Sequence, residues 1–130
     1  MKTLIVEDDV TSRVLLEEIL GAYGRAHVAV NGKEAVTAVK ASLDSGKTYD
    51  LICMDIMMPE MDGHEALREI RAMEAAYGIP NAQRAVVIMT TALHDAKNVM
   101  AAIAESSDAY LVKPIHKAKL LEKLSGLRLI

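Results

Sequence analysis

The sequence predicts an α/β fold in which a five-stranded parallel sheet is covered by helices on both faces. Five short runs of apolar residues alternate along the chain with five stretches whose apolar residues recur at helical spacing. The runs are apolar almost throughout, as strands of a parallel sheet buried on both faces require. Alternation of this kind implies right-handed strand–helix–strand crossovers. A doubly wound sheet is therefore the expected architecture.

The five strands are expected at short apolar runs bounded by polar or turn-forming residues. They cover residues 3–7, 25–30, 50–55, 85–90 and 109–113. The second run ends at Asn31-Gly32, a dipeptide that is typical of turns. Residues 44–49 and 75–84 have no clear period, so we expect loops there.

Each expected helix is marked by side chains that recur on one face. These are Val14, Leu15, Glu18, Ile19 and Ala22 in the first helix, Ala35, Val36, Val39 and Leu43 in the second, Leu67, Ile70 and Met73 in the third, Ala96, Val99, Met100 and Ile103 in the fourth, and Leu120, Leu121 and Leu124 in the fifth. A chain of 130 residues is long enough for one such core. We therefore expect a single domain over residues 1–130, with no output domain encoded.

Composition excludes several classes of protein. Hydrophobic residues make up 52% of the chain and charged residues 25%, which indicates a soluble globular protein. The net charge of −3 argues against direct nucleic-acid binding, which needs a basic face. No apolar run approaches the length of a membrane span, and the N-terminus turns acidic before a signal peptide could form. Cys53, the single cysteine, is expected to be a buried structural thiol, so a cytoplasmic location is expected.

Chemically reactive side chains collect where the expected strands end. The first strand runs into residues 7–9, Glu-Asp-Asp, and the third ends in Asp55. The fourth ends in residues 90–91, Thr-Thr, and the fifth in Lys113. Ligands of open α/β sheets bind beyond the carboxyl ends of the strands, so these groups would share one crevice. Several carboxylates together repel one another, and a divalent cation such as Mg²⁺ removes that cost and leaves room for a phosphoryl group.

Four motifs at these strand ends carry a resemblance to a known family. "LIVEDD", "DIMMPEMDG", "TTA" and "LVKP" occur in this order, each at the end of an expected strand. Together they resemble the receiver domain of two-component response regulators over residues 3 to 125. The resemblance implies a flavodoxin-like (βα)5 fold with strand order 2-1-3-4-5. It also implies a protein that catalyses only its own phosphorylation and dephosphorylation.

The resemblance assigns roles to the acidic residues. It implies that Asp55 accepts the phosphoryl group. Asp8 would bind Mg²⁺ directly, Glu7 would act through water, and the backbone carbonyl of Met57 would complete the protein ligands. Asp9 is expected outside the site.

The same resemblance assigns the groups that respond to the phosphoryl group. Thr91 would hydrogen-bond it, and is preferred over Thr90 because an alanine follows. Lys113 would pair with the phosphoryl oxygens, and its bond to Pro114 is expected to be cis. Tyr110 would be the switch aromatic.

Simpler interpretations remain open at several positions. Asp9 and Asp62 are expected to be turn formers or helix caps, and Tyr110 could be a core tyrosine. The four histidines, His27, His64, His94 and His116, lack metal-site spacing and are read as surface residues. Two features depart from the family pattern. Ile115 stands where Phe is common, which puts the packing beneath the last helix in question, and the loop at 75–84 is long.

The favoured function is a phosphorylation-activated signalling switch in a two-component phosphorelay. Its partners would be a sensor histidine kinase or a histidine phosphotransfer protein, and a downstream protein target. Whether it regulates that target or relays the group onward stays open. A phosphohydrolase with Asp55 as nucleophile would need a second acid at the position of Met57. A scaffold that binds without phosphorylation would be favoured by loss of Asp55 or Lys113, and both are present. Apolar Met57 and Leu93 predict slow decay of the phosphorylated state.

Overall fold

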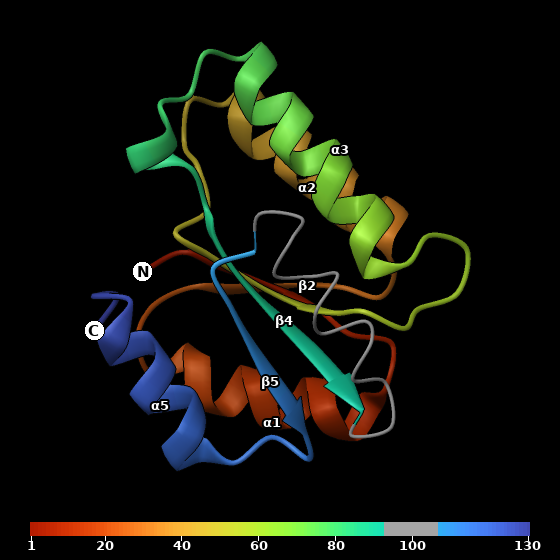
Figure 1. The fold of residues 1–130 in the computed structure, drawn as a ribbon, viewed down its shortest axis with the longest axis vertical. Coiled ribbons are helices and arrows are strands. Elements are labelled where there is room, and N and C mark those ends of the chain that lie inside the picture. Colours follow the sequence, from red (N-terminus) through yellow and green to blue (C-terminus); the bar gives the residue numbers. More distant parts are fainter. Residues whose placement is uncertain (93–106) are drawn as a thin grey trace.

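The computed structural model describes residues 1–92 and 107–130, and its strands and helices alternate as expected (Figure 1). The strands are β1 (Thr3–Val6), β2 (Ala26–Ala29), β3 (Leu51–Asp55), β4 (Val86–Ala92) and β5 (Ala109–Lys113). The helices are α1 (Val10–Gly21), α2 (Gly32–Asp44), α3 (Gly63–Ala76) and α5 (Lys117–Gly126), with a 3-10 turn at Asn81–Gln83. The fourth expected helix, around Ala96–Ile103, falls outside the described residues.

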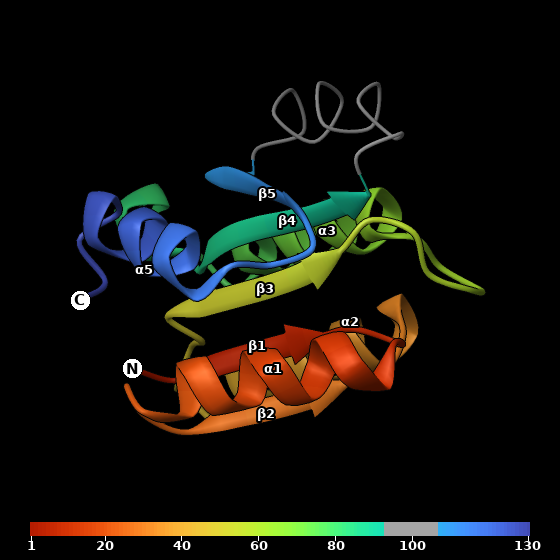
Figure 2. The same cartoon turned by 90° about the horizontal axis from the view of Figure 1, so that it is seen from below.

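The strands form one parallel sheet in the order β2-β1-β3-β4-β5, which confirms the predicted topology. β1 lies at the point where the strand order reverses, with β2 on one side and β3 on the other. Figure 2 shows α1 and α5 on one face of this sheet, while α2 and α3 cover the opposite face. Among the described residues, no helix is long and apolar enough to cross a bilayer.

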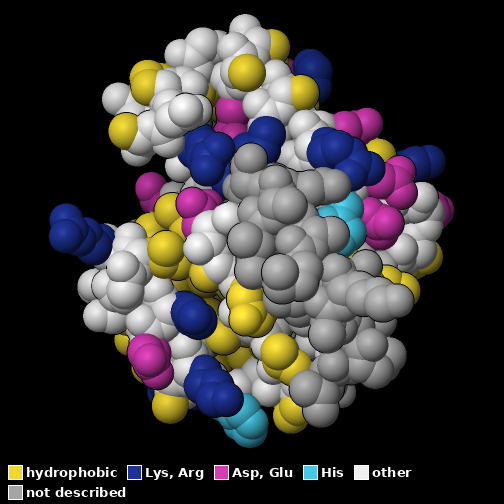
Figure 3. Space-filling model, viewed as in Figure 1, with side chains coloured by type: hydrophobic (Ala, Val, Ile, Leu, Met, Phe, Trp, Pro, Cys, Tyr) yellow, Lys and Arg dark blue, Asp and Glu magenta, His cyan; other side chains and the backbone are white. Residues whose placement is uncertain are grey.

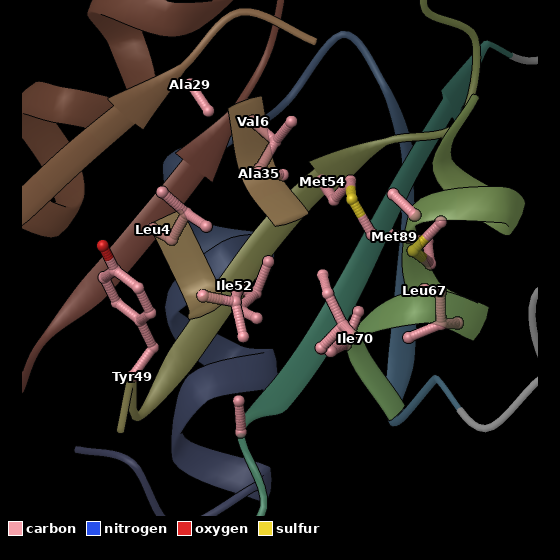
Figure 4. Packing of buried hydrophobic residues seen from close by; sticks show 14 of the residues in the cluster. Leu4, Val6, Ala29, Ala35, Tyr49, Ile52, Met54, Leu67, Ile70 and Met89 are labelled. Carbon is pink, nitrogen blue, oxygen red and sulfur yellow. The ribbon is translucent and has the colours of Figure 1, made fainter. Parts of the chain in front are cut away.

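Alternating strand residues build a separate core on each face of the sheet. Leu4, Ile52 and Met89 point toward α2 and α3, where Leu67 and Ile70 join them (Figure 4). The intervening residues pack against α1 and α5 in a second cluster, which contains Ile5, Cys53, Ile88, Leu120 and Leu124. Cys53 is fully buried, as expected of a structural thiol. Ile115 belongs to the same cluster and is 8% exposed, so isoleucine fills the position where the family often has phenylalanine.

The buried face of α1 differs from the predicted one. Leu16, Ile19 and Leu20 face the sheet, while Val14 is 48% exposed. Ala22, which was assigned to the apolar face, caps the helix at its end. The cause is ambiguity in the pattern: residues 14–16 are all apolar, so more than one helical face fits the sequence.

Most other boundaries agree with the predictions to within one or two residues. The largest difference is at β4, which continues to Ala92 and so includes both threonines of the motif. Part of the expected loop at 75–84 is ordered, since α3 extends to Ala76 and a 3-10 turn covers Asn81–Gln83. These differences leave the order of the strand ends unchanged.

Candidate metal and phosphoryl site

An acidic cluster lies at the carboxyl edge of the sheet, where two neighbouring strands end. β1 and β3 pair with Val6 beside Met54, so Glu7 and Asp55 leave the sheet side by side. With Asp8, they offer three carboxylate oxygens that all lie within 4.8 Å of one another. Glu7 and Asp55 are 1% and 5% exposed, whereas Asp8 is open to solvent. The structure thus brings together the three acids that the strand ends predicted.

Lys113 reaches this acidic cluster from the end of β5, two strands away from β3. Its Nζ atom lies 2.5 Å from Oε1 of Glu7 and 3.1 Å from Oδ2 of Asp55. The bond between Lys113 and Pro114 is cis, as the resemblance implies. One ammonium therefore faces two buried carboxylates, with a third close by, and the cluster has more negative than positive charge.

Burial and charge change the protonation of this cluster. Burial raises the pKa of Glu7 to about 7; the hydrogen bond from Lys113 opposes this rise, and the nearby Asp55 adds to it. Burial alone would lower the pKa of Lys113, but the hydrogen bond to Glu7 and the charges of both acids raise it overall. Lys113 is therefore a stable ammonium, while the Glu7 carboxylate is held at a cost that a further cation would remove.

The donor set fits Mg²⁺. All three candidate ligands are carboxylates, which are the hard oxygen donors that Mg²⁺ prefers. Mg²⁺ keeps several waters and is bound through one or two carboxylates plus phosphate oxygens, and Asp8 leaves one side of the cluster open to solvent. The excess negative charge of the acidic cluster favours the binding of a divalent cation.

The two threonines at the end of β4 occupy different positions relative to Asp55. Thr90 is the register partner of Asp55, and its carbonyl accepts a hydrogen bond from the Ile56 amide at 3.0 Å. Thr91 is one residue further along, fully buried, with its hydroxyl 3.4 Å from the carbonyl of Ala92. The contacts described for these residues connect neither hydroxyl to the Asp55 carboxylate. The preference for Thr91 therefore stays a prediction.

Met57 has a backbone contact to the cluster and an exposed side chain. Its amide donates a hydrogen bond to Oδ1 of Asp55 at 3.2 Å, and its side chain is 55% exposed. The loop begins at Asp55 and ends where the amide of Gly63 donates to the carbonyl of Ile56 at 2.8 Å. A Cβ on Gly63 would lie 2.6 Å from the carbonyl oxygen of Asp55, so only glycine lets α3 start this close to the acid.

Tyr110 lies on β5 beside Met89 and is 36% exposed. This exposure argues against the core tyrosine that the sequence left open. Val112, two residues further along, is also exposed, and both line a hollow with Lys119 and Lys123 of α5. Figure 3 shows hydrophobic side chains among Lys and Arg side chains on the face viewed in Figure 1. Tyr110 is therefore in a position to contribute to a surface.

Asp9 and Asp62 are helix caps, as expected. Their carboxylates accept hydrogen bonds from the amides of Ser12 and Glu65, each at 2.9 Å. The histidines were predicted to be surface residues, but His64 is half-buried and both of its ring nitrogens are buried. His94 lies outside the described residues.

Arg13 is a group near the site that the sequence analysis missed. Its Nη1 atom lies 3.5 Å from the carbonyl oxygen of Glu7. The helix cap at Asp9 is the sequence signal for this contact. Arg13 lies four residues after the cap, and a side chain at that position points back toward the start of the helix. Arg13 therefore adds a second cation to the surroundings of the cluster.

Comparison with known proteins adds a family to this geometry. The model of the response regulator receiver domain matches residues 3–125. The chemotaxis protein CheY of Thermotoga maritima is 32% identical over 126 residues, a stretch that covers 95% of this chain and 94% of CheY. Probable histidine kinase 2 of Oryza sativa subsp. indica is 31% identical over 97% of this chain, which spans only 13% of that protein.

A solved structure with the same fold holds a magnesium ion. The receiver domain of the sensor histidine kinase PA1611 from Pseudomonas aeruginosa has a TM-score of 0.78 and 29% identity. The match covers 96% of this chain and 94% of that one, and a magnesium ion is coordinated in the active-site cleft of the PA1611 domain.

Proposed function

Because the chain belongs to the response regulator receiver domains, we propose that it is a signalling switch activated by phosphorylation of Asp55. A receiver domain is not a conventional enzyme, since the phosphoryl group is transferred onto the domain itself. The observation that carries the proposal is the position of Asp55. Its carboxylate is 5% exposed, lies 3.1 Å from the Lys113 ammonium, and shares a cluster with two further acids.

The chemistry of the proposed transfer needs few protein groups. An oxygen of Asp55 forms a bond to phosphorus while the bond from phosphorus to the donor's imidazole nitrogen breaks, and the imidazole keeps the electron pair. The amide of Met57 and the Lys113 ammonium orient the attacking carboxylate. Lys113 then remains beside the new phosphoryl oxygens, which carry the charge that the ammonium neutralises.

Mg²⁺, when bound, would neutralise charge on the phosphoryl oxygens during transfer. Asp8 would ligate the ion directly because it is the exposed acid of the cluster. Glu7 would contribute through water, with its other contact to Lys113 retained. Asp55 and the carbonyl of Met57 would complete the protein ligands.

The proposed switch then changes a surface. A phosphoryl group on Asp55 adds charge and acceptor oxygens next to the end of β4, where Thr91 lies. Movement of the Thr91 hydroxyl toward these oxygens would alter the packing of β4 against β5, where Tyr110 is exposed. Such a coupling needs an element with two arrangements, and the Thr91–Tyr110 pair is the proposed one.

The proposed phosphodonor is a sensor histidine kinase or a histidine phosphotransfer protein in the cytoplasm. The relatives support a place in such a relay, since one is a probable histidine kinase and one is a chemotaxis protein. A phosphohydrolase gains no support, because the position two residues after Asp55 carries Met57 where a second acid is needed.

The experiment that tests the proposal is mass spectrometry after incubation with acetyl phosphate and Mg²⁺. The native chain should gain the mass of one phosphoryl group, and Asp55→Asn should gain none, because an amide is not a nucleophile. EDTA and Asp8→Ala serve as metal controls, and both should suppress the gain. A phosphorylated Asp55→Asn chain would mean that another residue is the acceptor.

A further inference from the structure

The segment between β3 and α3 carries the carbonyl that would bind the metal in the proposed site, so the contacts that set its shape bear on the metal. The loop, residues 56–62, projects beyond the end of β3 in Figures 1 and 2. Within it, the Met61 amide donates to the carbonyl of Pro59 at 2.8 Å, and Glu60 adopts a φ of 68°. A non-glycine residue at this φ costs free energy, so a contact from outside must hold the loop in this shape.

The first residue of α2 provides that contact. Gly32 is buried, and a Cβ built on it would lie 2.5 Å from the carbonyl oxygen of Met61 and 2.9 Å from its Cγ. No real Cβ approaches an oxygen that closely, so the backbone of α2 touches the loop directly. The φ of Gly32 is not in the left-handed region, which means that glycine is needed here for space and not for backbone conformation.

The start of α2 is a rigid support for this contact. The Asn31 side chain accepts from the amide of Glu34 at 2.9 Å, and the Glu34 carboxylate accepts from the amide of Val30 at 3.1 Å. The first bond caps the helix, and the second ties the first turn of α2 to the residue that precedes the cap. Behind it, Ala35 and Val39 anchor α2 in the core against the sheet.

We infer that Gly32 and Met61 are positioning residues for the metal, acting through the loop that carries Met57. Through this contact, α2 supports the loop. No residue of α2 would bind the metal, whereas the Met57 carbonyl of the loop would. The inference rests on the proposed function, because it needs Mg²⁺ at the acidic cluster. Supporting residues of a metal site typically contribute about 10- to 100-fold to its affinity.

The test is Gly32→Ala, with Gly21→Ala as the matched control. Both are glycine-to-alanine changes in a helix, but a Cβ at Gly21 meets nothing within 4 Å. Mg²⁺ affinity is measured by titration, with the amide NMR signals of Met57 and Met61 followed in the metal-free chain. Gly32→Ala should shift both signals and weaken Mg²⁺ binding about tenfold or more. Gly21→Ala should leave both readouts as in the native chain.

If Gly32→Ala does not fold, a second variant, Met61→Ala, tests the same inference. Met61→Ala keeps the carbonyl contact but removes the Met61 side chain beyond Cβ, whose Cγ lies against Gly32, and adds no atom. It should therefore fold and still weaken Mg²⁺ binding. Native affinity in every folded variant of this pair overturns the inference and leaves the proposed function intact. If the native chain binds no Mg²⁺, both the inference and the proposed function are overturned. The titration of the native chain therefore distinguishes the two failures.

Discussion

The amino and carboxyl edges of the sheet both hold buried ions, but only the amino edge gives every ion its partners. At the amino edge, Arg71 lies 2.8 Å from Glu74 and 3.2 Å from Asp108. Each of these acids also accepts a backbone amide at 2.8 Å, from Ala85 and Val87 respectively. Arg84 lies 4.0 Å from Asp108 and supplies a second cation. Two cations therefore face two acids there, and the network connects α3 to the starts of β4 and β5.

The carboxyl edge has the opposite arrangement. Among residues 1–92 and 107–130, Lys113 is the one cation that pairs with both Glu7 and Asp55, and Asp8 adds another carboxylate. Buried carboxylates that share one cation cost free energy, which a bound metal ion can release. The difference between the two edges indicates that the same residue types stabilise the fold at one end of the strands and remain available for chemistry at the other.

The largest expected effect follows from removing the acceptor at the carboxyl edge. Asp55→Asn should abolish phosphorylation, yet its free energy of unfolding without Mg²⁺ should equal the native value or exceed it. The reason is that one negative charge leaves a cluster with too many, while the amide oxygen can still accept from Met57. Urea unfolding checks this. A loss of more than about 1 kcal/mol would show that the carboxyl edge is as well balanced as the amino edge.

Removing the central cation of the amino edge should have the opposite outcome. Arg71→Met leaves Glu74, which is 4% exposed, without its cation. The free energy of unfolding should fall by about 3–5 kcal/mol, the usual effect of breaking a buried ion pair. Phosphorylation by acetyl phosphate, assayed where the variant is folded, should be unchanged. A matched control is Arg25→Met, an exposed position outside the network.

Lys113→Ala tests the difference between the two edges in another way, because Mg²⁺ can stabilise the acidic cluster that this variant leaves without its ammonium. Lys113→Ala leaves Glu7 and Asp55 unpaired, so the chain should be less stable without metal. Mg²⁺ should restore more of its melting temperature than it adds to the native chain, by preferential binding to the folded state. Arg71→Met should show no such recovery. Lys113→Ala should still bind Mg²⁺, while the structural response to phosphorylation becomes weak.

The comparison also shows what the sequence could and could not predict. The carboxyl edge was predictable because parallel strands end at the same edge, so Glu7, Asp55 and Lys113 had to converge. The amino-edge network was not, since Arg71 and Asp108 are distant in sequence and resemble surface charges. Their pairing depends on how α3 packs, which periodicity does not specify. The role of Gly32 was missed for the same reason, because it was read only as part of a turn.

The lifetime of the phosphorylated state tests the groups that surround Asp55. Hydrolysis needs a water in line with phosphorus, and apolar Met57 cannot hold one by a hydrogen bond. Leu93, which lies outside the described residues, is the second expected shield. In Met57→Asn with Leu93→Glu, decay after removal of the donor should be faster, by up to roughly 100-fold as positioning effects allow. An unchanged decay rate would contradict the shielding.

The smallest expected effect separates the two threonines at the end of β4. Thr90 is the register partner of Asp55, whereas the family resemblance favours Thr91. Replacement by valine keeps the shape of each side chain and removes one hydroxyl, and a hydrogen bond to a charged group contributes about 1.5–3 kcal/mol. If Thr91 binds the phosphoryl group, Thr91→Val should reduce the shift of the Tyr110 amide NMR signal on phosphorylation, and Thr90→Val should not. Both variants should still accept the group on Asp55, since neither hydroxyl contacts that carboxylate in the structure. The reverse result would assign the role to Thr90. The phosphoryl group would then be bound by the residue that pairs directly with Asp55 in the sheet.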